Sequence, residues 1–195
     1  MRYVLIVNPK AGRRNPLETV FPRVRDAFRS RDVDFTWHET EYPGHATRIA
    51  AAETGKGDAV RIYGFGGDGT LSEIAAGMIG RKNAELGIFP CGSGNDYIKT
   101  FGPEQNFLSP EKQIGARSGT VDMIRSGDRY AVNLCTVGMD AKIPLVVERL
   151  KRFRFLSGPA AYDLGLLKTL LGRIGDEMTV TIDGEETYDG CFLMA

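Results

Sequence analysis

Apolar residues recur with two different periods along the first hundred residues. A continuous apolar run at 3–7 predicts a strand buried on both faces. After it, Asn15 and Pro16 fit the N-cap and first position of a helix. Pro22 is expected to kink this helix or delay its regular start, because it cannot donate an intrahelical hydrogen bond. The pattern continues with a strand predicted at 33–38 and a helix predicted at 45–53.

The clearest strand and helix enclose a glycine-rich loop. Residues 60–63 are rich in β-branched and aromatic side chains, and apolar residues recur over 71–79 at the spacing of one helix face. The loop between them, residues 64–70, has the sequence GFGGDGT. Thr70 and Glu73 have the spacing of a capping box, which predicts that they open the helix.

Two further loops follow predicted strands. NPKAGRRN follows the first strand, and PCGSGND follows a short strand predicted at 86–89. Alternating strands and helices predict an α/β fold in which a mostly parallel sheet is flanked by helices. Because the carboxyl ends of parallel strands share one edge of the sheet, the loops at 8–14, 64–70 and 90–96 are predicted to face one crevice.

Beyond this sheet the pattern changes to a β-rich unit. Two strands are predicted around a tight turn at 126–128, with no crossover helix between them. Two helical insertions are expected next, at 143–150 and at 159–171.

The chain closes with a predicted hairpin that Asp183 and Gly184 turn. Its second strand stops within the apolar run CFLMA, so we expect this unit to be incomplete. The pattern therefore divides the chain into an α/β domain, residues 1–124, and a partial β-rich domain with helical insertions, residues 125–195.

Composition narrows the classes of function. Basic and acidic side chains number 25 each, so no net charge favours nucleic acid as a partner. Three widely separated cysteines without C-x-x-C spacing favour a reducing compartment. No apolar run approaches the about 18 residues of a membrane span, and the N-terminus lacks a signal-peptide pattern. These features predict a cytoplasmic protein without a transmembrane segment.

The glycine loop offers chemistry suited to phosphate. Bare backbone amides at a helix N-terminus attract anions, but Asp68 would repel them unless a cation such as Mg²⁺ lies between. A nucleoside triphosphate with its metal fits this pairing, whereas the structural alternative is a tight turn in which Asp68 caps the helix. Lys10, Arg13 and Arg14 in the first loop are either phosphate donors or solvated cations.

Other polar residues have simpler interpretations. His38 and His45 have no neighbours at metal-ligand spacing, so both are expected to be structural. Cations alternate with aromatic residues over 149–156, which is typical either of a surface that binds anionic membrane or of a solvated helix end. The cations are Arg149, Lys151, Arg152 and Arg154.

Five motifs together resemble the diacylglycerol kinase catalytic-domain family, in particular its bacterial lipid-kinase branch. They are NPKAG, YGFGGDGTLSE, PCGSGND, GTVDMI and NLCTVGMDA. The resemblance implies the fold of the NAD kinase and diacylglycerol kinase superfamily, in which an α/β nucleotide domain precedes a β-sandwich lipid domain. ATP is then expected in the cleft between the two domains.

The resemblance also implies a set of site residues. ATP is expected to contact Asn8, Gly12, Arg13, Thr40, Gly66, Gly67, Asp68, Gly69, Thr70, Gly92, Ser93 and Asn95. A water-linked Mg²⁺ network is expected at Asp68, Asp96 and Asp122, with Asp68 also positioning the phosphates for catalysis. Ser72 departs from the family pattern, which has asparagine there. The general base of the family is expected beyond Ala195, so the chain resembles a truncated member.

The implied function is a lipid kinase of phospholipid metabolism. It would transfer the γ-phosphate of ATP to the hydroxyl of diacylglycerol or a related lipid alcohol, giving phosphatidic acid. Its partners would be lipid at a membrane surface, which it contacts peripherally, and a second copy in a homodimer.

Three alternatives belong to other classes. NAD kinases share GGDGT but not PCGSGND, and an oxidoreductase is suggested because Gly64, Gly66 and Gly69 spell G-x-G-x-x-G. Against the oxidoreductase, that fingerprint belongs in the first strand–helix unit of a dinucleotide fold. The third alternative is a nucleotide-binding remnant without catalysis.

Overall fold

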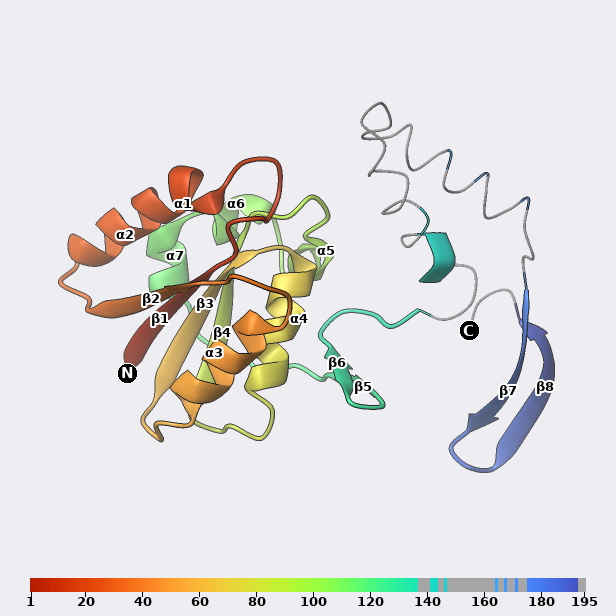
Figure 1. The fold of residues 1–195 in the computed structure, drawn as a ribbon. Coiled ribbons are helices and arrows are strands. Elements are labelled where there is room, and N and C mark those ends of the chain that lie inside the picture. The colour runs from red at the N-terminus through yellow and green to blue at the C-terminus, as the bar shows by residue number, and fades with distance from the viewer. Residues whose placement is uncertain are drawn as a thin grey trace. The chain divides into compact units, whose positions relative to one another are not determined.

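The computed structural model describes residues 1–136, 141–143, 146, 164, 167, 171 and 175–192. The chain divides into two compact units, Met1–Leu134 and Cys135–Ala195 (Figure 1).

A four-stranded parallel sheet forms the centre of the first unit. Its order is β2-β1-β3-β4, and every neighbouring pair is parallel, which confirms the predicted sheet. The strands are β1 (Arg2–Val7), β2 (Phe35–Glu39), β3 (Val60–Gly66) and β4 (Ala84–Pro90). Four strands in this order leave β2 and β4 at the edges.

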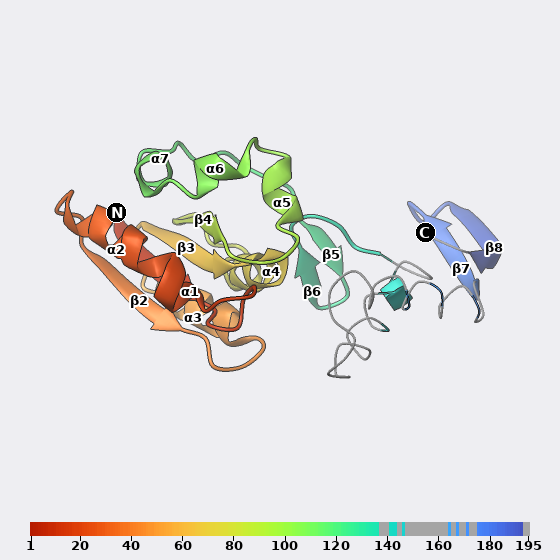
Figure 2. The same ribbon diagram turned by 90° about the horizontal axis from the view of Figure 1, so that it is seen from above.

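Helices cover both faces of this sheet (Figure 1). They are α1 (Pro16–Thr19), α2 (Phe21–Arg29), α3 (His45–Thr54), α4 (Asp68–Gly77), α5 (Asp96–Lys99), α6 (Glu104–Phe107) and α7 (Pro110–Ile114). Figure 2 shows α5, α6 and α7 following one another along the β4 side of the unit.

Successive side chains of β1 point to opposite faces of the sheet, which explains why helices cover both faces. Val4 and Ile6 pack with apolar residues of α3 and α4, whereas Leu5 and Val7 pack with the aromatic side of α2. All four side chains are completely buried, as expected for a strand of a doubly covered sheet.

The helix predicted after the first loop is broken by proline, as its sequence indicates. Asn15 accepts the amide hydrogen of Leu17 (3.0 Å) and caps α1, which ends at Thr19. Pro22 then occupies the first turn of a separate helix, α2, where a missing N–H costs nothing.

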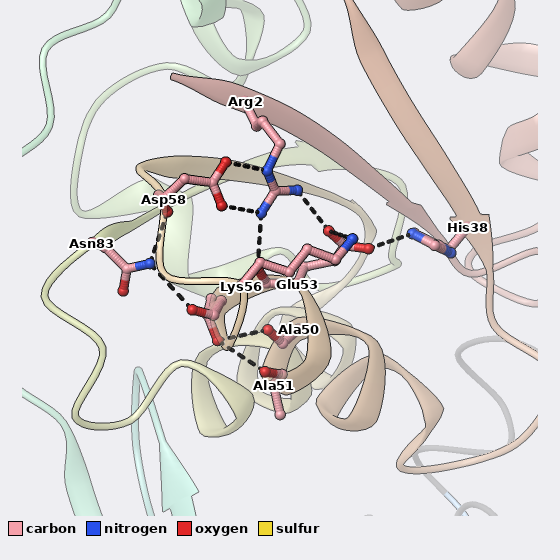
Figure 3. Close-up of polar contacts among 9 residues, drawn as sticks. Arg2, His38, Ala50, Ala51, Glu53, Lys56, Asp58 and Asn83 are labelled. Atoms are coloured by element: carbon pink, nitrogen blue, oxygen red, sulfur yellow. Dashed lines mark hydrogen bonds and ion pairs between the residues drawn. The ribbon is translucent and has the colours of Figure 1, made fainter.

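An ionic cluster fastens the start of β1 to the end of α3 (Figure 3). The Glu53 carboxylate is only 5% exposed and accepts hydrogen bonds from Arg2 (2.6 Å) and Lys56 (2.7 Å), and His38 lies 3.2 Å from it. Arg2 also donates to Asp58 at 3.0 Å. Burial alone would raise the pKa of Glu53, but the hydrogen bonds from Lys56 and Arg2 outweigh it and hold the pKa below its ordinary value of 4.5.

The two histidines have structural surroundings within the described part of the chain. His38 contacts Glu53, and the His45 ring stacks on Tyr42 with centroids 4.5 Å apart while Nδ1 accepts the amide hydrogen of Glu41. No group of three or more metal-ligating side chains occurs among the described residues.

A small hairpin follows α7 and belongs by its contacts to the first unit. It pairs β5 (Ile124–Ser126) with β6 (Arg129–Ala131) in antiparallel fashion, as predicted, and Gly127 at φ 60° makes the turn. The division of the chain into a nucleotide domain and a lipid domain at residue 124 stays a prediction.

In the second unit, a hairpin is described at the end of the chain. It pairs β7 (Asp176–Ile182) with β8 (Glu186–Phe192). Asp183 at φ 53° and Gly184 at φ 78° lie between these strands in the left-handed region, so the predicted turn is confirmed.

Several predictions concern residues that lie mostly outside the part of the chain that the structure describes. These are the helical insertions at 143–150 and 159–171, the cations and aromatic residues of 149–156, and the last residues of the CFLMA run. No helix within the described residues is long and apolar enough to cross a bilayer.

Candidate functional site

Three loops meet at the carboxyl edge of the sheet in the first unit. A Cβ atom on Gly12, in the loop after β1, would lie 2.1 Å from the carbonyl oxygen of Cys91 after β4. A Cβ atom on Gly92 would lie 2.6 Å from the Cα atom of Gly67 after β3. The loops therefore touch backbone to backbone, and glycine is required at these contacts because no side chain fits between them.

Asn8 ties the first loop to the glycine loop. Its Nδ2 donates to Thr70 Oγ1 at 3.0 Å, while its Oδ1 accepts the amide hydrogen of Lys10 at 3.0 Å. A Cβ atom on Gly66 would lie 2.3 Å from the same Thr70 oxygen. These contacts pack the threonine side chain under the loop, where it is 7% exposed.

The capping box predicted at Thr70 and Glu73 is wrong. α4 begins at Asp68, with Gly67 as its N-cap and no side chain capping it. Thr70 thus lies within the first turn, and its hydroxyl is engaged by Asn8. The helix starts earlier because β3 continues through Gly66 and leaves a single residue between strand and helix.

Asn95 closes the third loop on itself. Its Oδ1 accepts the amide hydrogen of Gly92 (3.1 Å), and its Nδ2 donates to the carbonyl oxygen of Gly92 (3.0 Å) and to Glu104 (3.3 Å). Its backbone is left-handed, with φ 51°. Ser93 and Gly94 therefore form the exposed tip of a short, internally bonded loop.

Asp68 caps a helix, but not its own. Its two oxygens accept the amide hydrogens of Asp96 (3.1 Å) and Tyr97 (3.0 Å), at the start of α5. This carboxylate fixes the third loop to the glycine loop, and the helix N-terminus favours its charge. Asp68 does not cap α4, the helix that contains it, so the structural alternative considered for this residue is not observed.

Two of the three predicted metal carboxylates lie together. A Cβ atom on Gly94 would be 3.2 Å from Asp96 Oδ2 and 3.4 Å from Asp68 Oδ2. Asp96 also pairs with Lys99 at 2.5 Å. Asp122 is exposed between α7 and β5, and the structure does not gather it into a three-carboxylate group with the other described residues.

The remaining predicted residues surround the same edge. Thr40 is 9% exposed and donates its amide hydrogen to Val7 at the end of β1, whereas Arg13 and Gly69 are exposed. Their roles toward a nucleotide stay predictions.

The thiol at this edge is not a nucleophile. Burial raises the pKa of Cys91 to about 12, so the sulfur stays protonated, and it donates to the carbonyl oxygen of Phe89. Burial also raises the pKa of Tyr97.

The residues present fit a metal-bound nucleotide. Bare glycines let a phosphate approach the backbone, and carboxylate oxygens are the ligands that Mg²⁺ prefers. A carboxylate has about four acceptor positions, so Asp68 retains some after accepting two amide hydrogens. Sequence reasoning missed two members of this network, the Tyr97 amide and Glu104. Tyr97 meets Asp68 across 29 residues of sequence, and Glu104 accepts from Asn95 nine residues before it, in a contact that no motif signals.

Comparisons with known proteins consistently find the diacylglycerol kinase catalytic domain and proteins named as lipid kinases. The sequence profile of the diacylglycerol kinase catalytic domain matches residues 2–126. A protein of Chromohalobacter salexigens named "Probable lipid kinase YegS-like" is 31% identical over 172 residues, covering 84% of this chain and 52% of that protein. A Staphylococcus aureus protein named "Putative lipid kinase SAR0780" is 28% identical over 160 residues, or 81% of this chain and 51% of that protein.

Solved structures agree with the sequence relatives. The crystal structure of a "putative diacylglycerol kinase" from Bacillus anthracis superimposes with a TM-score of 0.70 and 27% identity, covering 99% of this chain and 64% of that chain. This chain spans about half the length of the curated relatives that it matches.

Proposed function

This chain belongs to the diacylglycerol kinase catalytic domain family, and from this premise we propose that it acts in transfer of the γ-phosphate of ATP to a lipid alcohol. Diacylglycerol is the proposed acceptor. Its hydroxyl oxygen would bond to the γ-phosphorus as the bond to the β-phosphate oxygen breaks, giving phosphatidic acid and ADP, with the hydroxyl proton passing to a base.

The observation that carries the proposal is the meeting of three glycine loops at one sheet edge. A side chain at Gly12 or Gly92 would collide with neighbouring backbone, and one at Gly67 would be pressed against Gly92 at 3.0 Å. Phosphoryl transfer depends mainly on positioning and charge stabilisation, and loops held together by close backbone contacts would supply the positioning. Ser93 and Gly69 are exposed where a ligand can reach them.

The carboxylates are assigned to the metal. Asp68 and Asp96 would hold Mg²⁺, which when bound neutralises phosphate charge. Because Asp68 is already anchored to two amides of α5, it also keeps the third loop in register with the glycine loop. We place the base that accepts the lipid hydroxyl proton outside these 195 residues, in agreement with the family resemblance.

A second candidate is nucleotide binding without transfer by the 195-residue chain on its own. The observation that favours it is the coverage of about half of each curated relative. All three loops lie in the first unit, so the proposed phosphate contacts come from residues before 97.

Labelled ATP and diacylglycerol in mixed micelles separate these candidates. A protein extended to the length of its relatives should label phosphatidic acid, and the 195-residue chain should not do so measurably. Equal rates for both would refute the placement of the base and assign it to a carboxylate of this chain. Absence of lipid labelling by the extended protein, with ATP binding retained, would refute the kinase proposal.

A further inference from the structure

A hollow in the first unit contains none of the residues predicted to contact the nucleotide. It has a volume of about 380 Å³ and is lined by residues of α2, of β2 and of the turn that joins them. The charged and aromatic part of its lining comprises Arg25, Arg29, Asp32, Asp34 and Trp37. Small-molecule sites have volumes of about 300–1,000 Å³, so the hollow has room for one small ligand.

The turn between α2 and β2 fixes the position of two carboxylates. The amide of Asp32 donates to the carbonyl oxygen of Arg29 (3.1 Å), and the amide of Val33 donates to that of Phe28 (3.1 Å). These two hydrogen bonds form a Schellman motif, in which Asp32 takes the left-handed position with φ 54°. The motif ends the helix so that Asp32 and Asp34 line the same hollow as Arg29, the last residue of α2.

Charges of both signs line the hollow without pairing with one another. Arg25 is neutralised by Asp26, 3.0 Å away. The side chains of Arg29, Asp32 and Asp34 form no ion pair with any other residue that the structure describes. One guanidinium and two carboxylates are therefore left for a ligand, with an excess of one negative charge.

Neighbouring charges do not alter this balance. Arg31 belongs to the turn but does not line the hollow, and it pairs with Glu111 at 3.8 Å. Glu39, the last residue of β2, is also outside the lining. The hollow therefore suits a ligand that carries an anionic group together with an excess of cationic charge.

Trp37 adds an aromatic surface to the hollow. Its ring packs against Phe21 with centroids 5.1 Å apart, and 48% of the residue remains exposed. The face of an indole ring attracts cations more strongly than that of other aromatic side chains. An exposed indole beside free carboxylates is suited to a guanidinium or ammonium group.

We propose that this hollow binds a basic amino acid such as arginine, either free or as the last residue of a peptide. Arg29 receives the carboxylate, because its guanidinium presents a planar fork that matches two carboxylate oxygens. The cationic side chain of the ligand lies against Asp32, Asp34 and Trp37. A free basic amino acid also carries an α-ammonium group, so its single net positive charge balances the excess negative charge of the hollow.

Other classes of ligand leave part of the hollow unmatched. A phosphate or nucleotide would meet two free carboxylates, and a polyamine would leave Arg29 without an anion. A neutral apolar ligand would cover three charged side chains without pairing them, which is costly.

Trp37 is the only tryptophan of the chain, so its fluorescence reports directly on the hollow. Titration of the 195-residue chain with L-arginine at constant ionic strength should give a saturable change in emission, in the millimolar range expected of a few exposed contacts. Citrulline, which lacks the side-chain charge, and agmatine, which lacks the carboxylate, should each bind at least about threefold more weakly. No saturable change with L-arginine, or equal affinity for citrulline, would overturn the proposal.

Substitutions separate the two ends of the ligand. Arg29→Gln should weaken L-arginine binding at least about threefold and leave agmatine binding unchanged, because agmatine has no carboxylate. Asp34→Asn should weaken the binding of both ligands. Asp32→Asn should do so as well, since asparagine also tolerates the left-handed backbone. Arg23→Gln, on the same helix but outside the hollow, should change neither affinity.

The pattern of losses distinguishes binding from folding. A misfolded variant would lose both ligands, whereas Arg29→Gln should lose only the preference for L-arginine over agmatine, and circular dichroism checks the fold of each variant. Equal weakening of both ligands by a folded Arg29→Gln protein would contradict the proposal. Full binding of L-arginine by a folded Asp34→Asn protein would equally contradict it.

The peptide Gly-Gly-Arg identifies the source of the ligand. Binding of this peptide at least as tightly as free L-arginine would assign the hollow to the last residue of a peptide, and its amidated form should then bind more weakly because it lacks the carboxylate. Binding of L-arginine without binding of the peptide would assign the hollow to the free amino acid. Binding of neither would refute both.

Discussion

Gly92→Ala tests whether the three loops need to touch backbone to backbone. The φ angle of Gly92 is not in the left-handed region, so the effect of the added methyl group is steric. Its Cβ atom would lie 2.6 Å from Gly67 Cα and 2.8 Å from Asn95 Oδ1. Both distances are too short for van der Waals contact, so the third loop must move away from the glycine loop.

The magnitude follows from two opposing effects. Overpacking costs about 1–3 kcal/mol, and replacing glycine by alanine recovers about 0.4–1 kcal/mol by restricting the unfolded chain. The free energy of unfolding should therefore fall by about 1–2 kcal/mol. ATP affinity should fall as well, because the displaced loop carries Ser93 and Asn95.

Gly69→Ala is the matched control. A Cβ atom on Gly69 would have no neighbour within 4 Å, and the residue lies inside α4, where alanine is favoured over glycine by about 0.5–1 kcal/mol. This variant should be as stable as the parent or more stable, yet it should bind ATP more weakly if phosphate approaches the exposed loop.

Urea unfolding followed by Trp37 fluorescence measures the stability of the first unit, and calorimetric titration measures ATP affinity. The reasoning would be refuted by a Gly92→Ala protein with unchanged stability and unchanged affinity. Equal destabilisation by both alanines would also contradict it, because only one of them meets backbone.

Three other changes have defined outcomes. Asp68→Asn should lower kcat/KM of the extended protein by at least about 2 kcal/mol in transition-state stabilisation, and unchanged turnover and Mg²⁺ dependence would contradict the metal assignment. Glu53→Gln should lower the free energy of unfolding at neutral pH by about 2 kcal/mol, measured by urea titration. The pKa of Glu53 in the folded protein lies below 4.5, so the stability that its ionised carboxylate contributes is complete above that pH and is lost as the pH falls through the folded pKa. The loss of stability caused by Glu53→Gln should therefore shrink in acid, and a loss that grows in acid would contradict this reasoning. Tyr63→Phe should cost about 1–2 kcal/mol in the same assay, since the Tyr63 hydroxyl donates to the buried carbonyl oxygen of Gln113 at 2.7 Å. No change for Tyr63→Phe would show that water replaces the hydroxyl.

The sheet was predictable because its signals are local. β1 and β3 are short apolar runs, β2 shows an alternation of polar and apolar residues, and Pro22 marks a helix boundary by its own chemistry. Asp183 and Gly184 are likewise residues whose backbone preferences specify the turn between β7 and β8.

The site was predictable only as a set of loops. Asp68 meets the amides of Asp96 and Tyr97 across 28 and 29 residues of sequence, and no local pattern encodes that contact. The same limitation explains the error at Thr70, whose hydroxyl contacts Asn8 from another loop instead of capping α4. The spacing of a capping box is a local signal, and a long-range contact overrides it here.

Titration of the 195-residue chain with ATP, in Mg²⁺ and again in excess chelator, tests the central claim most directly. We expect saturable binding of one nucleotide per chain that weakens at least about tenfold without the metal, because Asp68 and Asp96 then face the phosphates uncompensated. Absence of binding by the folded chain, or equal affinity with and without Mg²⁺, would contradict the assignment of these loops to a metal-bound nucleotide.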